Sequence, residues 1–218
     1  MLDLNHIILT GDRTADVCLI QPIDHGEDTT LEEQLAAIRQ RTDRPFLLCA
    51  VPVTDWNGDL SPWEAPPVFG KVPFGGHGSE TLAAIENRLI PQLQRGCGAA
   101  TFLLGGYSLA AFFALWACYE TDAFAGVACA SPSVWFPGWI EKAESGRPRT
   151  KSVYLSLGDR EEKAKNRVMA TVGDCIRRQH ALLESDPNVE TVLEWNEGNH
   201  FKDAPLRTAK AFAWLLDR

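Results

Sequence analysis

The sequence predicts a three-layer α/β sandwich built on a mostly parallel, doubly wound sheet. Short apolar runs alternate with helical segments along the whole chain, which is the pattern of strands interleaved with helices. The most apolar runs, near the middle of the chain, lack polar alternation, as parallel strands covered on both faces do. No repeat or Ser/Gly-rich linker divides the chain, so we expect a single domain over residues 1–218.

Six runs are expected to form strands because they are short, apolar or β-branched, and bounded by polar or glycine-containing segments. They are residues 16–23, 45–53, 99–104, 124–130, 151–157 and 189–195. Residues 54–78, rich in Pro, Gly and Trp, form an irregular segment that is too long for an ordinary connection. Long loops of this kind often border functional sites.

Five segments between and after these runs have helical periodicity. They are residues 30–41, 79–94, 109–119, 165–183 and 205–216. Thr30 and Glu33 have the spacing of a capping box at the start of the first helix, and Pro91 is expected to kink or end the second. The third helix is apolar all round and is therefore expected to be buried.

Composition excludes several classes of protein. The formal charge of −8 and the pI of about 5.1 disfavour binding to nucleic acid or to anionic membrane surfaces. No apolar run approaches the ~20 residues of a membrane span, and the N-terminus does not resemble a secretory signal, so we expect a cytoplasmic protein. The six cysteines are scattered singly. They are expected to be reduced and to bind no metal, since no ligand spacing is present.

The clearest chemical motif is the run GGYSLA, Gly105 to Ala110. It follows an expected strand and leads directly into an expected helix, which is the context of a nucleophile elbow with the pattern G-x-S-x-A. Ser108 is the candidate nucleophile, and the amide of Leu109 at the helix N-terminus is a candidate oxyanion donor. A glycine-rich turn without catalytic function is the alternative interpretation.

A serine nucleophile needs a histidine base and a carboxylate that orients it, and both follow in the order Ser, acid, His. His200 lies in the loop after the last expected strand, behind Gly198 and Asn199. Asp159 and Glu161 lie in the loop after the preceding strand. Either carboxylate could reach an imidazole; we prefer Glu161 and keep Asp159 as the second choice.

These residues resemble the esterase D and enterochelin esterase group of α/β-hydrolases over most of the chain. The resemblance rests on GGYSLAA with its apolar helix, on ASPSVWF at residues 130–136, on the Gly158 loop and on Gly198-Asn199-His200. It implies the α/β-hydrolase fold without a separate cap domain, and Glu161 as the acid, three residues after Gly158. Ala110 departs from the usual glycine of the elbow.

The resemblance also implies a second oxyanion donor in the loop after the first expected strand, which carries His25-Gly26. The amide of Glu27 is the candidate, and a donor near Asp55 and Trp56 is the alternative.

Aromatic residues of the two long loops, among them Trp56 and Trp135, could form a substrate pocket together with Tyr107, or could be ordinary core residues. Trp135 is the preferred pocket wall because its segment leaves the strand expected beside the nucleophile strand.

We therefore predict a serine esterase that acts on a small-molecule ester with a small or exposed acyl group and requires no metal or organic cofactor. The preference for esters over amides comes from the resemblance alone. A thioesterase or a siderophore-ester hydrolase with the same triad is one alternative. A catalytically silent binding protein with this fold is the other.

Overall fold

The structure is a computed structural model, and it describes residues 2–24, 26–68 and 70–218. Its main sheet has seven strands in the order β1-β3-β2-β6-β7-β8-β9. The strands are β1 (Ile8–Gly11), β2 (Val17–Ile23), β3 (Leu47–Pro52), β6 (Thr101–Tyr107), β7 (Gly126–Ala130), β8 (Ser152–Gly158) and β9 (Glu190–Asn196). All neighbours pair in parallel except β1, which lies antiparallel on β3. The predicted mostly parallel sheet is confirmed.

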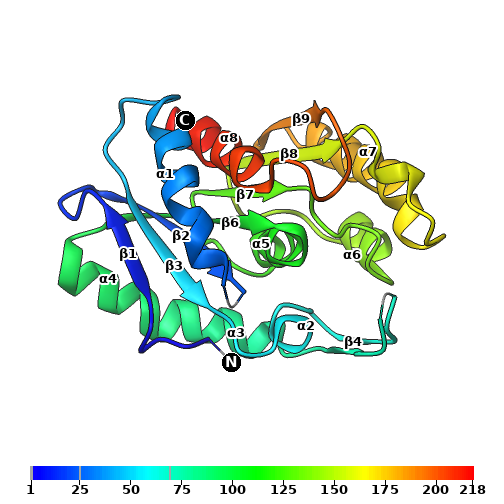
Figure 1. Cartoon of the computed structure of the whole chain (residues 1–218), viewed down its shortest axis with the longest axis horizontal. Helices are drawn as coiled ribbons and strands as arrows, with labels where there is room; N and C mark the ends of the chain where they lie inside the picture. The colour runs from blue at the N-terminus through cyan, green and yellow to red at the C-terminus, as the bar shows by residue number, and fades with distance from the viewer. Residues whose placement is uncertain (1, 25, 69) are drawn as a thin grey trace.

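Helices cover both faces of the sheet, as the three-layer prediction requires (Figure 1). On one face lie α1 (Leu31–Arg39) and α8 (Ala204–Leu216), which contact each other. The other face carries α3 (Gly78–Ala84), α4 (Ile90–Cys97), α5 (Ser108–Glu120), α6 (Trp139–Ser145) and α7 (Val172–Glu184). The strands have no polar alternation because each face of the sheet is buried beneath helices.

Strand β2 contributes side chains to the hydrophobic cores on both faces of the sheet. Cys18 and Ile20 belong to the core beneath α5, whereas Val17 and Leu19 belong to the core beneath α1 and α8. Successive side chains of a strand point to opposite faces, so every position of β2 is apolar or buried. Helix α5 is buried from Leu109 to Tyr119, as its apolar sequence predicts.

All six predicted strands form, with ends shifted by at most three residues, but smaller elements were not predicted. These are the edge strand β1, the helix α6 and, within the irregular segment 54–78, α2 (Trp56–Asp59), β4 (Glu64–Ala65) and β5 (Phe74–Gly75). Such elements are too short to show a periodic pattern.

Three helix predictions were partly wrong. A π-helical segment, Ile85–Leu89, widens the second helix just before Pro91, and the chain continues helically to Cys97 although Pro91 has no amide hydrogen. The first helix begins at Leu31 after a 3-10 turn, Glu27–Thr30, without the predicted Thr30 capping bond. Helix α7 starts only at Val172, after a separate 3-10 turn at Met169–Thr171.

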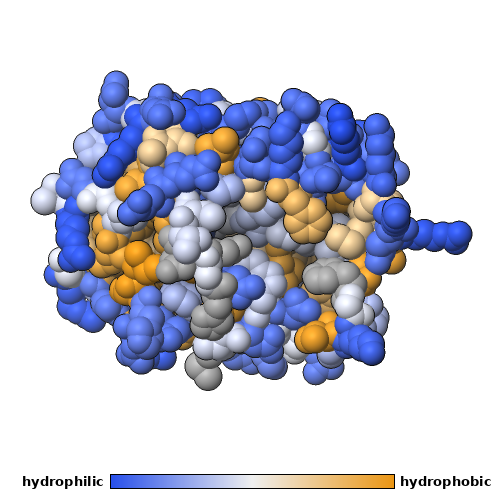
Figure 2. Space-filling model, in the orientation of Figure 1, coloured by the Kyte–Doolittle hydropathy of each residue, from blue (hydrophilic) through white to orange (hydrophobic). Residues whose placement is uncertain are grey.

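The surface in Figure 2 is mostly hydrophilic, with apolar patches between the polar side chains. Large apolar side chains that are exposed belong to Val72, Val168, Trp195 and Phe201. Within the described ranges, no helix is long and apolar enough to cross a membrane. All six cysteines are free thiols.

Candidate active site

The turn between β6 and α5 has the backbone conformation of a nucleophile elbow. Ser108 adopts a φ of 58°, a left-handed conformation that is costly for a residue with a side chain and is characteristic of functional turns. A methyl group on Gly106 would come within 2.8 Å of the Ala110 Cβ, and one on Gly105 within 2.5 Å of the Ala128 Cβ. The small residues of GGYSLA are therefore needed to let the turn pack against α5 and β7.

Three loops at the carboxyl edge of the sheet bring Ser108, His200 and Glu161 into one chain of hydrogen bonds. The Nε2 of His200 lies 2.9 Å from the Ser108 Oγ, and its Nδ1 lies 2.7 Å from the Glu161 Oε2. Glu161 is the first residue of a 3-10 turn after β8, and His200 lies between β9 and α8. The side chain of His200 is 23% exposed, and that of Glu161 is 5% exposed.

Asp159, the second choice for the acid, has a different partner. Its Oδ1 accepts a hydrogen bond of 2.8 Å from the amide of Gly198, and its own amide donates to the carbonyl of Asn196. Asp159 thus holds the loop that carries His200 against the end of β8. Among the described residues, no hydrogen bond joins Asp159 to the imidazole, so its role differs from that of Glu161. The geometry pairs the histidine with Glu161.

The surroundings of Glu161 stabilise its ionised form. Burial raises the pKa of this carboxyl, but the hydrogen bond and charge of His200, together with bonds from the Gly158 amide and Ser131, lower it. The net pKa lies below the usual value of a glutamate. A carboxylate held ionised beside the Nδ1 of His200 favours the tautomer whose Nε2 can accept a proton from Ser108.

Two residues of the site were missed by the sequence analysis. Ser131, just after β7, donates to the Oε1 of Glu161 over 2.8 Å, and Arg207 of α8 forms a salt bridge of 3.0 Å to the same oxygen. The available signal was an arginine in line with apolar positions of one helix, since the buried residues Ala211 and Leu215 lie one and two turns further on. Such a position requires a buried charged partner.

The predicted pocket residues lie in different surroundings. Trp135 is only 8% exposed and packs against Phe74, with 6.2 Å between ring centroids, which resembles core packing. Trp56, in α2, is half-buried against the same core. The hydroxyl of Tyr107 donates to the carbonyl of His200 over 2.7 Å. Burial raises the pKa of Tyr107, so the hydroxyl keeps its proton at neutral pH.

The candidate oxyanion donors lie at the ends of adjacent strands. Leu109 is the second residue of α5, where amides have no partner within the helix. Glu27 begins the 3-10 turn after β2, and β2 pairs directly with β6. The alternative donor region follows β3, one strand further away, and the Asp55 amide there already donates to Asp59. His25 lies outside the described residues.

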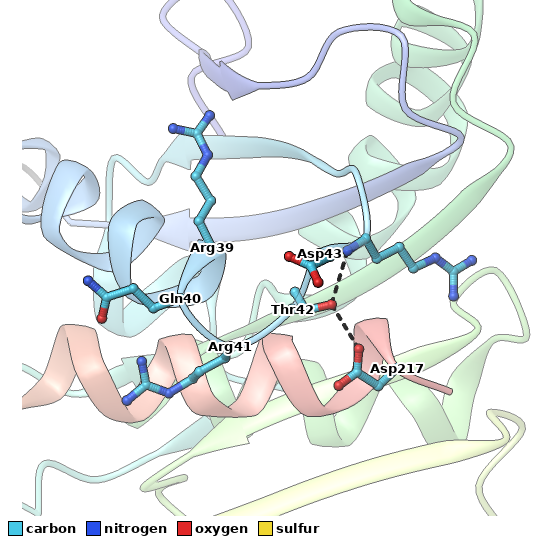
Figure 3. A pocket seen from close by; sticks show the side chains of 7 residues that line it. Arg39, Gln40, Arg41, Thr42, Asp43 and Asp217 are labelled. Atoms are coloured by element: carbon cyan, nitrogen blue, oxygen red, sulfur yellow. Dashed lines mark hydrogen bonds between the residues drawn. The ribbon is translucent and has the colours of Figure 1, made fainter.

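A shallow hollow of about 450 Å³ lies at the opposite edge of the sheet (Figure 3). It is lined by residues 39–44 and Asp217, which precede β3 and follow α8. Its arginines are partly engaged, since Arg44 donates to the carbonyls of Leu216 and Arg218. Because Ser108 lies at the carboxyl edge, this hollow is separate from the triad.

The architecture and elbow define an α/β-hydrolase fold. Comparison with protein-family models gives no match, and comparison with curated proteins gives none either. Solved structures do match. The siderophore hydrolase EstA from Aspergillus nidulans is 18% identical, with a TM-score of 0.76 over 97% of this chain and 89% of that one.

Two further structures have the same fold. An IroE-like serine hydrolase from Shewanella oneidensis is 14% identical with a TM-score of 0.79, and the match covers 97% of this chain and 75% of that one. The enterobactin and salmochelin hydrolase IroE is 16% identical with a TM-score of 0.64, over 96% and 86%. The chain thus has the fold of enterochelin esterase-like α/β-hydrolases, in agreement with the resemblance found in the sequence.

Proposed function

We propose that this protein is a serine hydrolase that cleaves carboxylic esters, with Ser108 as the nucleophile, His200 as the general base and Glu161 as the acid that orients it. The observation that carries the proposal is the unbroken chain of hydrogen bonds from the Ser108 Oγ through His200 to Glu161. Its position at a strained strand-to-helix elbow supports the same assignment.

The proposed reaction follows from this geometry. The Nε2 of His200 removes the proton of Ser108 as Oγ attacks the ester carbonyl, and Glu161 balances the positive charge on the imidazole. The imidazolium then returns the proton to the leaving alcohol, which breaks the C–O bond and leaves an acyl-serine. Water, activated by His200 in the same way, releases the acid and restores the serine.

The negative charge on the tetrahedral intermediate requires two amide donors. The Leu109 amide, at the positive end of α5, supplies the first. We propose the Glu27 amide as the second, because β2 pairs in parallel with β6 and both end at the same edge.

A siderophore ester is the second candidate substrate, and the observation that favours it is the repeated match to siderophore hydrolases. EstA and EstB are named siderophore hydrolases, IroE is named an enterobactin and salmochelin hydrolase, and all three share this fold. His200 and Ser108 are partly exposed, so the site is open enough for a bulky substrate to present one ester. A short-chain ester and a siderophore ester are distinguished by their relative kcat/KM.

The test is labelling with a fluorophosphonate probe, with hydrolysis of short p-nitrophenyl esters followed in parallel. Ser108→Ala is expected to lose both labelling and turnover, whereas the matched variant Ser145→Ala, at an exposed serine whose hydroxyl donates to the Lys142 carbonyl, keeps both. Absence of labelling in folded wild-type protein would favour the silent binding protein. Labelling that persists in Ser108→Ala would show that another residue is the nucleophile.

A further inference from the structure

Arg207 is an unusually buried arginine with an unusually large number of partners. Its side chain is 2% exposed, and its two terminal nitrogens make five hydrogen bonds. It projects from the first turns of α8, a helix packed on β6, β7 and β8. A charge buried this deeply is stable only when it is paired and hydrogen-bonded, so its partners indicate what it does.

One bond of Arg207 helps to fix the orientation of the carboxylate of Glu161, the proposed acid. The Oε1 of Glu161 accepts from Arg207 NH1 at 3.0 Å, from the Gly158 amide at 2.8 Å and from the Ser131 hydroxyl at 2.8 Å. Three donors on one oxygen leave Oε2 for the Nδ1 of His200. The carboxylate therefore cannot rotate away from the imidazole without breaking several bonds at once.

On the other side, Arg207 holds the loop that carries the proposed base. Its NH2 donates to the carbonyls of Glu197 and Asn199, each over 3.1 Å. Its NH1 also donates to the Tyr107 hydroxyl over 3.1 Å, and that hydroxyl donates to the carbonyl of His200. Tyr107 immediately precedes the nucleophile, so the guanidinium is bonded to the segments of all three triad members.

We infer that Arg207 is the positioning residue of the triad: its guanidinium fixes the acid and the histidine loop at once. This inference rests on the proposed function for its effect on catalysis. Arg207 does not touch the reacting atoms, so its removal is expected to lower kcat with little change in KM.

The experiment compares Arg207→Met, Arg207→Lys and the control Arg177→Met. Arg177 pairs with Glu162, next to the acid in sequence, but its side chain is 49% exposed. Each variant is measured for kcat and KM on a p-nitrophenyl ester. The NMR signal of the proton on the Nδ1 of His200, which reports its bond to Glu161, is also recorded, with His200→Asn used to assign it among five histidines. Folding is monitored by circular dichroism.

Arg207→Met is expected to lower kcat by about 10- to 100-fold with little change in KM. It is also expected to shift or weaken the Nδ1 proton signal of His200, because the acid and the histidine loop are no longer held together. Arg207→Lys keeps the charge but not the fork of donors, so its kcat falls about tenfold. Arg177→Met changes neither kcat nor the signal.

Wild-type kcat in Arg207→Lys, or an unchanged Nδ1 proton signal of His200 in folded Arg207→Met, would overturn the inference. If Arg207→Met does not fold, the kcat of Arg207→Lys decides the positioning role. If the wild-type protein hydrolyses no ester, the proposed function fails, yet the NMR signal still tests whether Arg207 holds His200 against Glu161.

Discussion

The exchange of Glu161 for glutamine tests the site most directly, because the surrounding donors dictate how the new amide must lie. The Oε1 of Glu161 accepts from the Gly158 amide, the Ser131 hydroxyl and Arg207. In Glu161→Gln, the amide oxygen must take that position, since an NH2 group there would face three donors. The NH2 group then faces the Nδ1 of His200.

This orientation forces the wrong tautomer on the histidine. An NH2 group at 2.7 Å from Nδ1 requires Nδ1 to accept, so the proton moves to Nε2, which then cannot take the proton of Ser108. The corresponding change in a serine protease triad lowers kcat about 10⁴-fold, equivalent to about 5 kcal/mol of barrier. We expect a loss of about 10³- to 10⁴-fold here, with KM nearly unchanged.

The matched control is Asp159→Asn. Asp159 uses Oδ1 to accept from the Gly198 amide, and an asparagine oxygen can accept the same bond, so kcat is expected to fall no more than about threefold. Steady-state hydrolysis of a p-nitrophenyl ester by both variants, with thermal melts to verify folding, gives the comparison. A larger loss in Asp159→Asn than in Glu161→Gln would refute the assignment of the acid.

Three other outcomes are expected. Trp135→Ala should lower the free energy of unfolding by about 3–5 kcal/mol in urea denaturation, because the side chain is 8% exposed; full stability with a changed acyl-chain preference would make Trp135 a pocket wall. Gly106→Ala should abolish activity, because its methyl group lies 2.8 Å from the Ala110 Cβ, and Ala110→Gly in the same chain should restore part of it; no recovery would mean that another contact limits the turn. The pKa of Glu161 is lower in the folded protein than in the unfolded chain, so the unfolded chain binds the carboxyl proton more tightly. The ionised carboxylate therefore stabilises the fold fully above about pH 5, and this contribution is lost as the pH falls through the folded-state pKa. Urea denaturation at a series of pH values should show a shallower acid loss in Glu161→Gln, and identical slopes would contradict this.

The amino-acid sequence alone determined the features of this protein that depend on residues close together in the chain, which are the strands, the helices and the elbow. Strand and helix periodicity predicted the six parallel strands because burial on both faces of the sheet leaves a continuous apolar run. The elbow could be predicted because Gly106, Ser108 and Ala110 are constrained by one tight turn. The edge strand β1 and the short elements of residues 54–78 left no such pattern, since each spans four residues or fewer.

The sequence ranked Glu161 above Asp159, but only the tertiary structure shows which of the two contacts His200. Both lie in one short loop, and their different partners arise from how the ends of β8 and β9 lie side by side. Arg207 is 46 residues from Glu161 in the chain, and its role depends on α8 packing against the sheet. Spacing along a sequence fixes local geometry, whereas a hydrogen bond between distant segments depends on every element that packs between them.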